Sequence, residues 1–147
     1  MRKTLLALAA GVLYSSAALA QVSVSDAWIR ATVPQQKSAG AFMRVRSAAP
    51  AKLVAVRTPL AANAELHEMQ MQGQTMRMHA VESLALPAGQ DVVLGPGGYH
   101  VMLFGLKQQL KEGDSVPLTL VVEGAANKRQ EVQVSVAVKP IAYQPPK

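Results

Sequence analysis

Short apolar stretches alternate with turn-forming residues along most of the chain after residue 20. In residues 131–138, every second position is a valine, and polar or small side chains occupy the positions between. Residues 116–122 alternate in the same way, with Leu118 and Leu120 on one face. Because successive side chains of a strand point to opposite faces, this period of two predicts half-buried β-strands with these valines and leucines turned inward.

The same analysis predicts further strands at residues 22–30, 41–46, 52–57 and 99–104. Turn signals such as Pro87-Ala88-Gly89 and the glycine-rich residues 95–98 separate the apolar stretches. Many short strands between regular turns are typical of an all-β sandwich or barrel. Residues 105–111 fit either a loop or one short helical turn, and the sequence indicates neither an internal repeat nor a second domain.

Residues 65–71 and 76–81 predict a β-hairpin with a four-residue turn at 72–75. Alternation then places three groups of side chains, each on one face of its strand: His67, Met69 and Met71; Met76 and Met78; His100 and Met102. Glu68 and His79 are expected to point to the opposite face. The hairpin and the strand at 99–104 thus gather imidazole and thioether groups.

Four of these side chains follow fixed spacings that suit a metal site. Ten residues separate His67 from Met78, twenty-one separate Met78 from His100, and one separates His100 from Met102. Two imidazoles and two thioethers, in a chain with no cysteine, are the donor set expected for copper(I). Zinc is disfavoured because its sites use thiolate, imidazole and carboxylate ligands. The sequence predicts one copper(I) per chain, held by neutral ligands that permit transfer to a thiolate acceptor.

The methionines also allow other interpretations. Met69, Met71 and Met76 are expected either to pack or to form an apolar rim that keeps water from the ion, and Met69 or Met76 is a possible substitute ligand. Methionine also fills irregular gaps in protein cores, so a flexible core is the alternative for this group. Taken alone, Met78 fits a core position better than a ligand position.

The N-terminus predicts a secretion signal. Met1-Arg2-Lys3 precedes an apolar stretch at residues 5–19, and Ala18-Leu19-Ala20 forms a small-x-small cleavage site. A membrane anchor is the alternative, but the stretch is short and interrupted, and a spanning helix needs about 20 apolar residues. We expect a signal peptide at 1–20, a metal-binding domain at 21–139 and a short tail at 140–147, in the periplasm of a Gram-negative bacterium.

Charge and composition exclude several function classes. The formal net charge is +6, but the cations are scattered and no basic run is interleaved with aromatic residues, which argues against nucleic-acid binding. The lack of cysteine excludes thiol–disulfide chemistry and blue-copper electron transfer. A phosphate-binding loop, a nucleophile elbow and a pair of carboxylates near the histidines are all missing from the sequence, so we expect no enzyme.

The spacing of these ligands resembles that of the periplasmic copper chaperones called PCu(A)C, whose signature is His-x10-Met-x21-His-x-Met. His67, Met78, His100 and Met102 match it at every position. Four further segments resemble the family: Ala27-Trp28-Ile29-Arg30, Gly40-Ala41-Phe42-Met43, Glu65-Leu66-His67-Glu68-Met69 and Pro96-Gly97-Gly98-Tyr99-His100-Val101-Met102-Leu103. The resemblance implies a cupredoxin-like Greek-key β-sandwich that binds one copper(I) through the four side chains.

The resemblance also implies delivery of copper to respiratory haem–copper oxidases, to a copper-accepting oxidase subunit or alongside a Sco-type thiol protein. Some family members carry a His- and Met-rich tail for a second copper, which residues 140–147 lack. We therefore expect a monomeric periplasmic copper(I) metallochaperone that acts by ligand exchange. A periplasmic copper buffer or resistance protein using the same site is the alternative, and a metal-free β-sandwich interaction module is the third reading.

Overall fold

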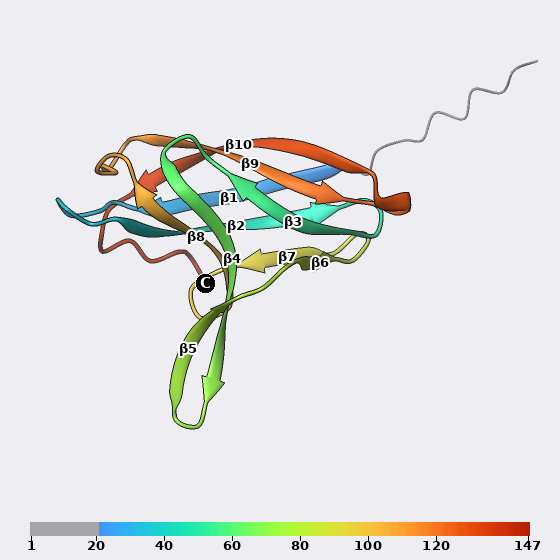
Figure 1. The fold of residues 1–147 in the computed structure, drawn as a ribbon, viewed down its shortest axis with the longest axis horizontal. Helices are drawn as coiled ribbons and strands as arrows, with labels where there is room; N and C mark the ends of the chain where they lie inside the picture. The colour runs from blue at the N-terminus through green and yellow to red at the C-terminus, as the bar shows by residue number, and fades with distance from the viewer. Residues whose placement is uncertain (1–20) are drawn as a thin grey trace, which may run out of the picture.

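The computed structural model describes residues 21–147 (Figure 1). The predicted signal peptide at 1–20 lies outside these described residues. The described residues form ten β-strands and one short 3₁₀ turn: β1 Val22–Arg30, β2 Ser38–Ser47, β3 Ala51–Arg57, β4 Ala61–Gln72, β5 Thr75–Ala80, β6 Leu84–Leu86, β7 Asp91–Leu94, β8 Tyr99–Leu106, β9 Ser115–Glu123, η1 Ala125–Asn127 and β10 Arg129–Lys139. The predicted all-β fold is confirmed.

Hydrogen bonds join the strands into one continuous sheet in the order β5-β4-β8-β2-β1-β10-β9-β3-β6, with β7 also paired to β2. β1 links the two halves of this sheet, because it runs antiparallel to β2 and parallel to β10. Five connections cross between the halves: β2 to β3, β3 to β4, β5 to β6, β6 to β7 and β8 to β9. The last strand lies beside the first and runs parallel to it.

A single hydrophobic core draws side chains from both halves of the sheet. Val101 of β8 is fully buried, as are Leu118 and Leu120 of β9 and Val136 of β10, and all belong to one cluster. The sheet therefore folds over and encloses its apolar face between two layers. The inward orientation predicted for Leu118 and Leu120 is confirmed, and burial of such side chains stabilises the fold by about 1.5–3 kcal/mol each.

Three local features differ from the sequence-based prediction or resolve it. The strands β6 and β7 were missed, because three or four residues are too few to show a period of two. The turn of the hairpin is shorter than predicted: Gln72 pairs with Thr75, which leaves only Gly73 and Gln74 between β4 and β5. Residues 107–111 form a loop after β8, and not a helical turn.

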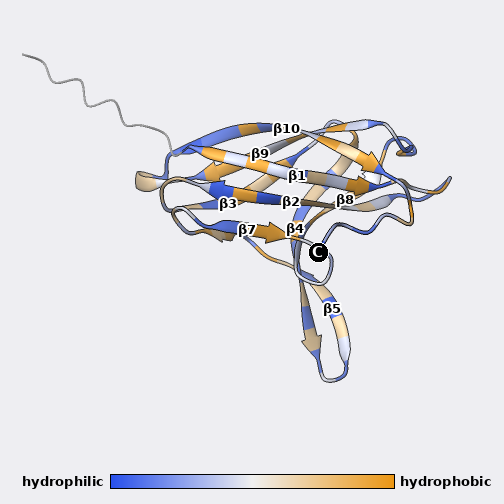
Figure 2. Cartoon of the chain, turned by 180° about the vertical axis from the view of Figure 1, so that it is seen from behind, coloured by the Kyte–Doolittle hydropathy of each residue, from blue (hydrophilic) through white to orange (hydrophobic). Residues whose placement is uncertain are grey.

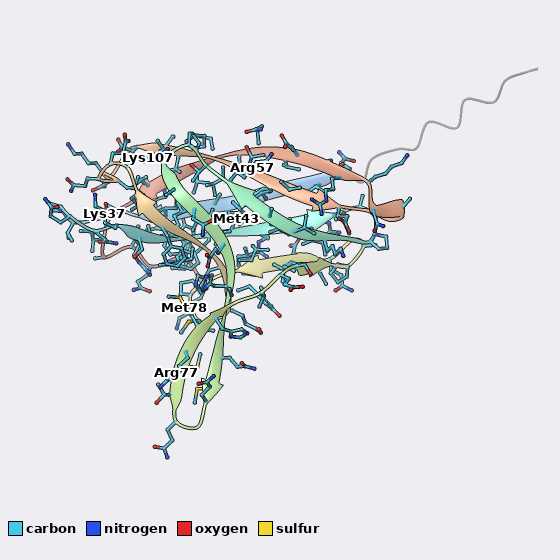
Figure 3. All side chains as sticks on the ribbon, in the orientation of Figure 1. Lys37, Met43, Arg57, Arg77, Met78 and Lys107 are labelled. Carbon is cyan, nitrogen blue, oxygen red and sulfur yellow. The ribbon has the colours of Figure 1, made fainter. Side chains whose placement is uncertain are left out.

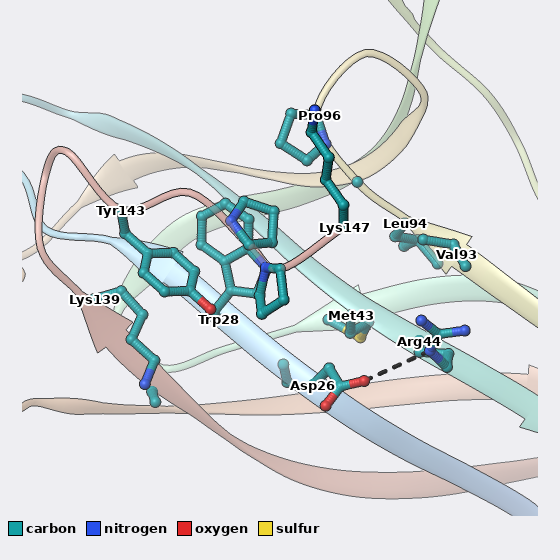
Figure 4. A pocket seen from close by; sticks show the side chains of 15 residues that line it. Asp26, Trp28, Met43, Arg44, Val93, Leu94, Pro96, Lys139, Tyr143 and Lys147 are labelled. Atoms are coloured by element: carbon teal, nitrogen blue, oxygen red, sulfur yellow. Dashed lines mark ion pairs between the residues drawn. The ribbon is translucent and has the colours of Figure 1, made fainter.

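Residues 140–147 lie against the folded domain and begin with a turn, in which the Tyr143 N–H donates to the Pro140 carbonyl at 2.9 Å. The ring of Tyr143 packs edge-on to Trp28, with ring centroids 4.9 Å apart, and the Nε–H of Arg30 donates to the Tyr143 carbonyl at 3.2 Å. Figure 4 shows the hollow that this tail covers, with Trp28, Met43 and Pro96 around it. Among the described residues that line this hollow there is no histidine, so it is separate from the predicted metal ligands.

The β4–β5 hairpin projects from the body of the molecule (Figure 1). β4 has 12 residues, but its pairing with β8 ends where Glu68 faces Tyr99. Its remaining residues pair with β5, and the Met69 N–H also donates to the Gly98 carbonyl at 3.1 Å. Figure 2 shows that this arm carries both apolar and polar positions. Consequently β4 leaves the body at His67 and Glu68, which is where the predicted donors begin.

Two glycines near this arm allow a test of how closely β4 and β8 pack. Gly105 in β8 has a φ of +66°, and a Cβ there would lie 2.8 Å from the Cβ of Ala62 in β4. Gly73 in the hairpin turn has a φ of +65°, but a Cβ there would meet nothing within 4 Å. Gly73→Ala should cost only the strain of a positive φ, about 1 kcal/mol. Gly105→Ala should cost about 3 kcal/mol, because a steric clash adds to that strain.

Urea unfolding, followed by the fluorescence of the buried Trp28, measures both variants against the parent chain. Equal losses of stability in the two variants would contradict close packing of Gly105 on Ala62.

Candidate metal centre

His67 and His100 lie directly opposite each other on the neighbouring strands β4 and β8. Their strand neighbours Leu66 and Val101 point into the core, so alternation turns both imidazoles to the other face of the sheet. The two residues are only 7% and 6% exposed, and their ring centroids are 5.8 Å apart. Phe104 packs 5.7 Å from His67, and Phe42 packs 6.1 Å from His100. The two imidazoles thus lie close together in a largely aromatic setting.

A hydrogen bond fixes the orientation of His100. Its Nδ1 lies 3.1 Å from the carbonyl oxygen of Gly98. Since a carbonyl oxygen can only accept, Nδ1 carries the proton and Nε2 carries the lone pair. A hydrogen bond from the other ring nitrogen is the usual way in which a protein orients a metal-binding histidine.

His67 has one satisfied ring nitrogen and one without a partner. Its Nε2 lies 2.8 Å from Oε2 of Glu65, and Nδ2 of Asn63 donates to the other carboxylate oxygen at 2.7 Å. Because an ionised carboxylate only accepts, Nε2 carries the proton and Nδ1 the lone pair. Nδ1 is buried, and it has no hydrogen-bond partner among the described residues. Buried polar atoms are rarely left unpaired, and an ion is one of the few groups that satisfy such an atom.

Met102 lies two residues beyond His100 on the same face of β8, where it pairs with Gly40 of β2. Both line a hollow of about 250 Å³, together with Gly40, Phe42, Met69, Pro96 and Gly97. Gly40 leaves room for the Phe42 ring in the wall of this hollow, because a Cβ there would come within 3.1 Å of that ring. The hollow therefore gives a thioether and an imidazole access to the same space.

Met78 lies on β5, outside the residues that line this hollow. It pairs with Met69 across the hairpin, and both share the hairpin face of His67, which pairs with Ala80. The side chain of Met78 is 45% exposed, and Figure 3 shows it near the base of the arm. The structure thus brings His67 beside His100, and it brings His100 and Met102 to one hollow that His67 does not line. Met78 lies on the arm, opposite Met69, which does line the hollow.

The exposure of the methionines decides against the core alternative. Met71 and Met76 are 57% and 43% exposed, and Met78 is similarly open, whereas only Met43 belongs to the hydrophobic core of the described residues. A flexible methionine core is therefore the wrong interpretation for the hairpin. A rim of thioethers beside the histidines agrees with their positions.

The opposite face of the hairpin is polar. Glu68 pairs with His79, and their side chains lie 3.6 Å apart on the face away from His67, as predicted. The carboxylate of Glu68 also lies beside Tyr99, where its charge, partial burial and a hydrogen bond raise the pKa of the phenol. In the described part of the chain, no group of three His, Asp or Glu side chains forms a metal site, so sulfur donors are needed to complete one.

Sequence reasoning missed the groups that support the histidines. Glu65 shares the face of His67 by simple alternation, so its position two residues earlier was an available signal. It is a single carboxylate beside an imidazole, which differs from the carboxylate pairs of acid–base enzymes. The carbonyl of Gly98 and the ring of Phe104 depend on the register between strands, which no local pattern reveals.

Comparison with known proteins places the chain in a family. Residues 22–138 match the family described as lipoprotein LpqE-like. A relative in Leifsonia xyli subsp. xyli (strain CTCB07), named as a lipoprotein, is 32% identical over 100 residues. This match covers 67% of the present chain and 60% of the relative, so the chain spans less than two thirds of that relative's length. No helix among residues 21–147 is long and apolar enough to cross a membrane.

Solved structures with a similar fold include DR1885 from Deinococcus radiodurans in two states. The apo form is 32% identical, with a TM-score of 0.59 over 95% of this chain and 97% of that chain. The copper(I) form is 34% identical, with a TM-score of 0.56 over 79% and 76%. The copper-bound PCuAC domain of PmoF2 is 25% identical, with a TM-score of 0.68 over 84% and 96%.

The resemblance to the PCu(A)C proteins is thus confirmed over nearly all of the described chain. The protein has the cupredoxin-like β fold of the PCuAC domains, and it belongs to the LpqE-like family.

Proposed function

We propose that this protein is an extracytoplasmic copper(I) carrier that holds one ion with His67, Met78, His100 and Met102. The observation that carries the proposal is the buried Nδ1 of His67, which has no hydrogen-bond partner within residues 21–147 and lies in a ring that faces His100 across β4 and β8. The exposed thioether of Met78 and the thioether of Met102 supply the sulfur that copper(I) prefers. The copper-bound relatives DR1885 and PmoF2 support the choice of metal.

The ion is cargo, and the residues of the chain determine how it is held and released. Gly98 and Glu65 fix the two imidazoles, so the nitrogen donors keep their positions while the ion leaves. All four donors are neutral, and no donor must be deprotonated for binding. Release proceeds by ligand exchange: an acceptor thiolate forms a bond to copper as an exposed thioether is displaced. Anionic sulfur binds copper(I) more strongly than a thioether, which sets the direction of transfer.

The acceptor that fits this chemistry is a thiolate-bearing copper centre in the periplasm. We propose a haem–copper oxidase subunit or a Sco-type thiol protein as the recipient, with the carrier acting as a monomeric chaperone in oxidase assembly. The second candidate is a copper buffer or resistance protein. The same neutral donor set favours it equally, because a readily exchanged ion also suits storage.

Substitution of each donor tests the site. Titration with copper(I) against a chromophoric chelator should show one tightly bound equivalent in the parent protein. His100→Ala and Met78→Leu should each weaken binding by roughly tenfold or more, which is about 1.4 kcal/mol or more. Leucine keeps the volume and apolarity of methionine, so a loss in this variant reports the missing sulfur.

Met69→Leu is the matched control, because Met69 pairs with Met78 on the same hairpin face. A loss of copper(I) affinity in Met69→Leu, with none in Met78→Leu, would show that Met69 and not Met78 is the fourth ligand. Parent protein that does not compete with the chelator would reject the carrier proposal altogether.

The Glu65 carboxylate should act as a positioning group for His67. Glu65→Gln keeps the size of the side chain, but its amide can donate a hydrogen bond and so removes the preference for a lone pair on Nδ1. Changes to such supporting groups typically cost tenfold to a hundredfold, roughly, in metal affinity, and we expect a loss of this order for copper(I).

Glu68→Gln provides the comparison on the opposite face of the same strand and should leave the affinity unchanged. Nitrogen-15 spectra of the imidazoles should show a changed tautomer ratio at His67 only in Glu65→Gln. Similar affinities in both variants would show that the carboxylate does not position the ring.

Deletion of the gene distinguishes a chaperone from a buffer. Under limiting copper, a chaperone deletion should lower oxidase activity, because the enzyme then receives its metal slowly. The parent gene should restore that activity, and the His100→Ala gene should not. Normal oxidase activity combined with sensitivity to excess copper would favour the buffer.

A further inference from the structure

The hairpin face that begins at His67 continues outward as two cross-strand methionine pairs. Met69 pairs with Met78, and Met71 pairs with Met76. Cross-strand partners project on the same side of a sheet with Cβ atoms about 5 Å apart, so all four thioethers share one face. Successive pairs are separated by two residues, which is about 7 Å along a strand. The four side chains form a methionine ladder that leads from the tip of the arm to the histidines.

The outer pair is open to solvent and has no place in the core. Met71 and Met76 are 57% and 43% exposed, and they lie beyond the last residue of β4 that pairs with β8. Figure 3 shows sulfur atoms along the arm, away from the body of the molecule. Nothing in the fold therefore requires these two side chains to be apolar.

The residues of the arm indicate that these positions require sulfur, and not only an apolar side chain. Its other face carries polar partners, with Gln70 opposite Arg77 and Gln72 opposite Thr75. Strands β9 and β10 of the body use valine and leucine for their inward positions, which are the residues that a sheet prefers. On the face of the arm that carries His67, both cross-strand pairs beyond that histidine, Met69 with Met78 and Met71 with Met76, consist of methionines.

We propose that Met71 and Met76 form a second copper(I) site, an outer position through which the ion passes between the inner centre and an exchange partner. This inference rests on the proposed function, since it adds a step to copper transfer. In that step copper(I) is bound by the thioethers of Met71 and Met76, then forms bonds to the next pair as the outer bonds break. Copper remains monovalent, and no proton moves, because a thioether has none to lose.

Two thioethers alone should bind more weakly than the inner set, which adds two imidazoles. A weak outer position suits passage, because the ion can leave it in either direction. Arg77 lies on the other face of β5, so its charge does not enter the space between Met71 and Met76. The ladder also extends the reach of the copper site beyond the body, to the end of the arm.

Methionine methyl NMR tests the outer site directly. The protein is labelled with carbon-13 at the methionine methyl groups and titrated without oxygen with copper(I) supplied as its acetonitrile complex. The first equivalent should move the methyl signal of Met102 and the signal of Met78 or Met69. The second should move Met71 and Met76 together. In Met71→Leu/Met76→Leu the second equivalent should be lost, while the first binds as before.

Gln70→Leu is the control for apolarity on the other face of the arm and should retain both equivalents. A second equivalent that moves other methyl signals, or survives in the double leucine variant, would overturn the outer site. The two proposals fail separately. Loss of the first equivalent with Met71 and Met76 still responding would reject the inner carrier centre, whereas a first equivalent with no response at Met71 and Met76 would reject only the outer one.

Discussion

The hydrogen-bonded register of β4 with its two neighbours is the constraint on which the candidate site depends. Within the body, β4 pairs with β8 as far as Glu68, and from His67 outward it pairs with β5. His67 therefore belongs to both pairings, and it faces His100 on one side and the methionine arm on the other. A shift of one residue in either register would turn a histidine or the whole set of thioethers to the opposite face. Burial of Leu66 and Val101 in the core stabilises the register between β4 and β8.

The same register buries an unpaired polar atom, which lowers the stability of the fold. Two imidazoles lie side by side with almost no solvent contact, and one ring nitrogen has no hydrogen-bond partner in the described part of the chain. A buried polar atom without a hydrogen bond costs about 1–3 kcal/mol. The core beneath it, drawn from both halves of the sheet, is large enough to tolerate this cost. A bound cation would remove this cost by coordinating the unpaired nitrogen. The fold therefore contains a site whose polar atoms are fully satisfied only when a ligand is bound.

Local sequence patterns predicted the long strands well because a buried face imposes a period of two over many residues. They also predicted which side chains share a strand face, including the separation of His79 and Glu68 from His67. They could not predict which strands become neighbours: nothing local shows that His67 and His100 pair directly, or that Glu65 and Gly98 supply their hydrogen bonds. β6 and β7 were too short to show periodicity, and the two-residue turn at Gly73 extended the arm further than expected. The assignment of the four ligands stays a prediction, because it concerns bonds to an ion and not the fold.

The projecting arm explains how a site with buried nitrogen donors can still exchange its ion. Imidazoles held by Glu65 and Gly98 cannot move far without breaking their hydrogen bonds, so they suit retention. Thioethers on a two-stranded arm are flexible and exposed, so they suit exchange. His67, His100 and Met102 lie on strands of the body and suit retention, whereas the exposed Met78 lies on the arm and suits exchange. An acceptor then needs to approach only the methionine face, and the folded body need not open for copper to leave.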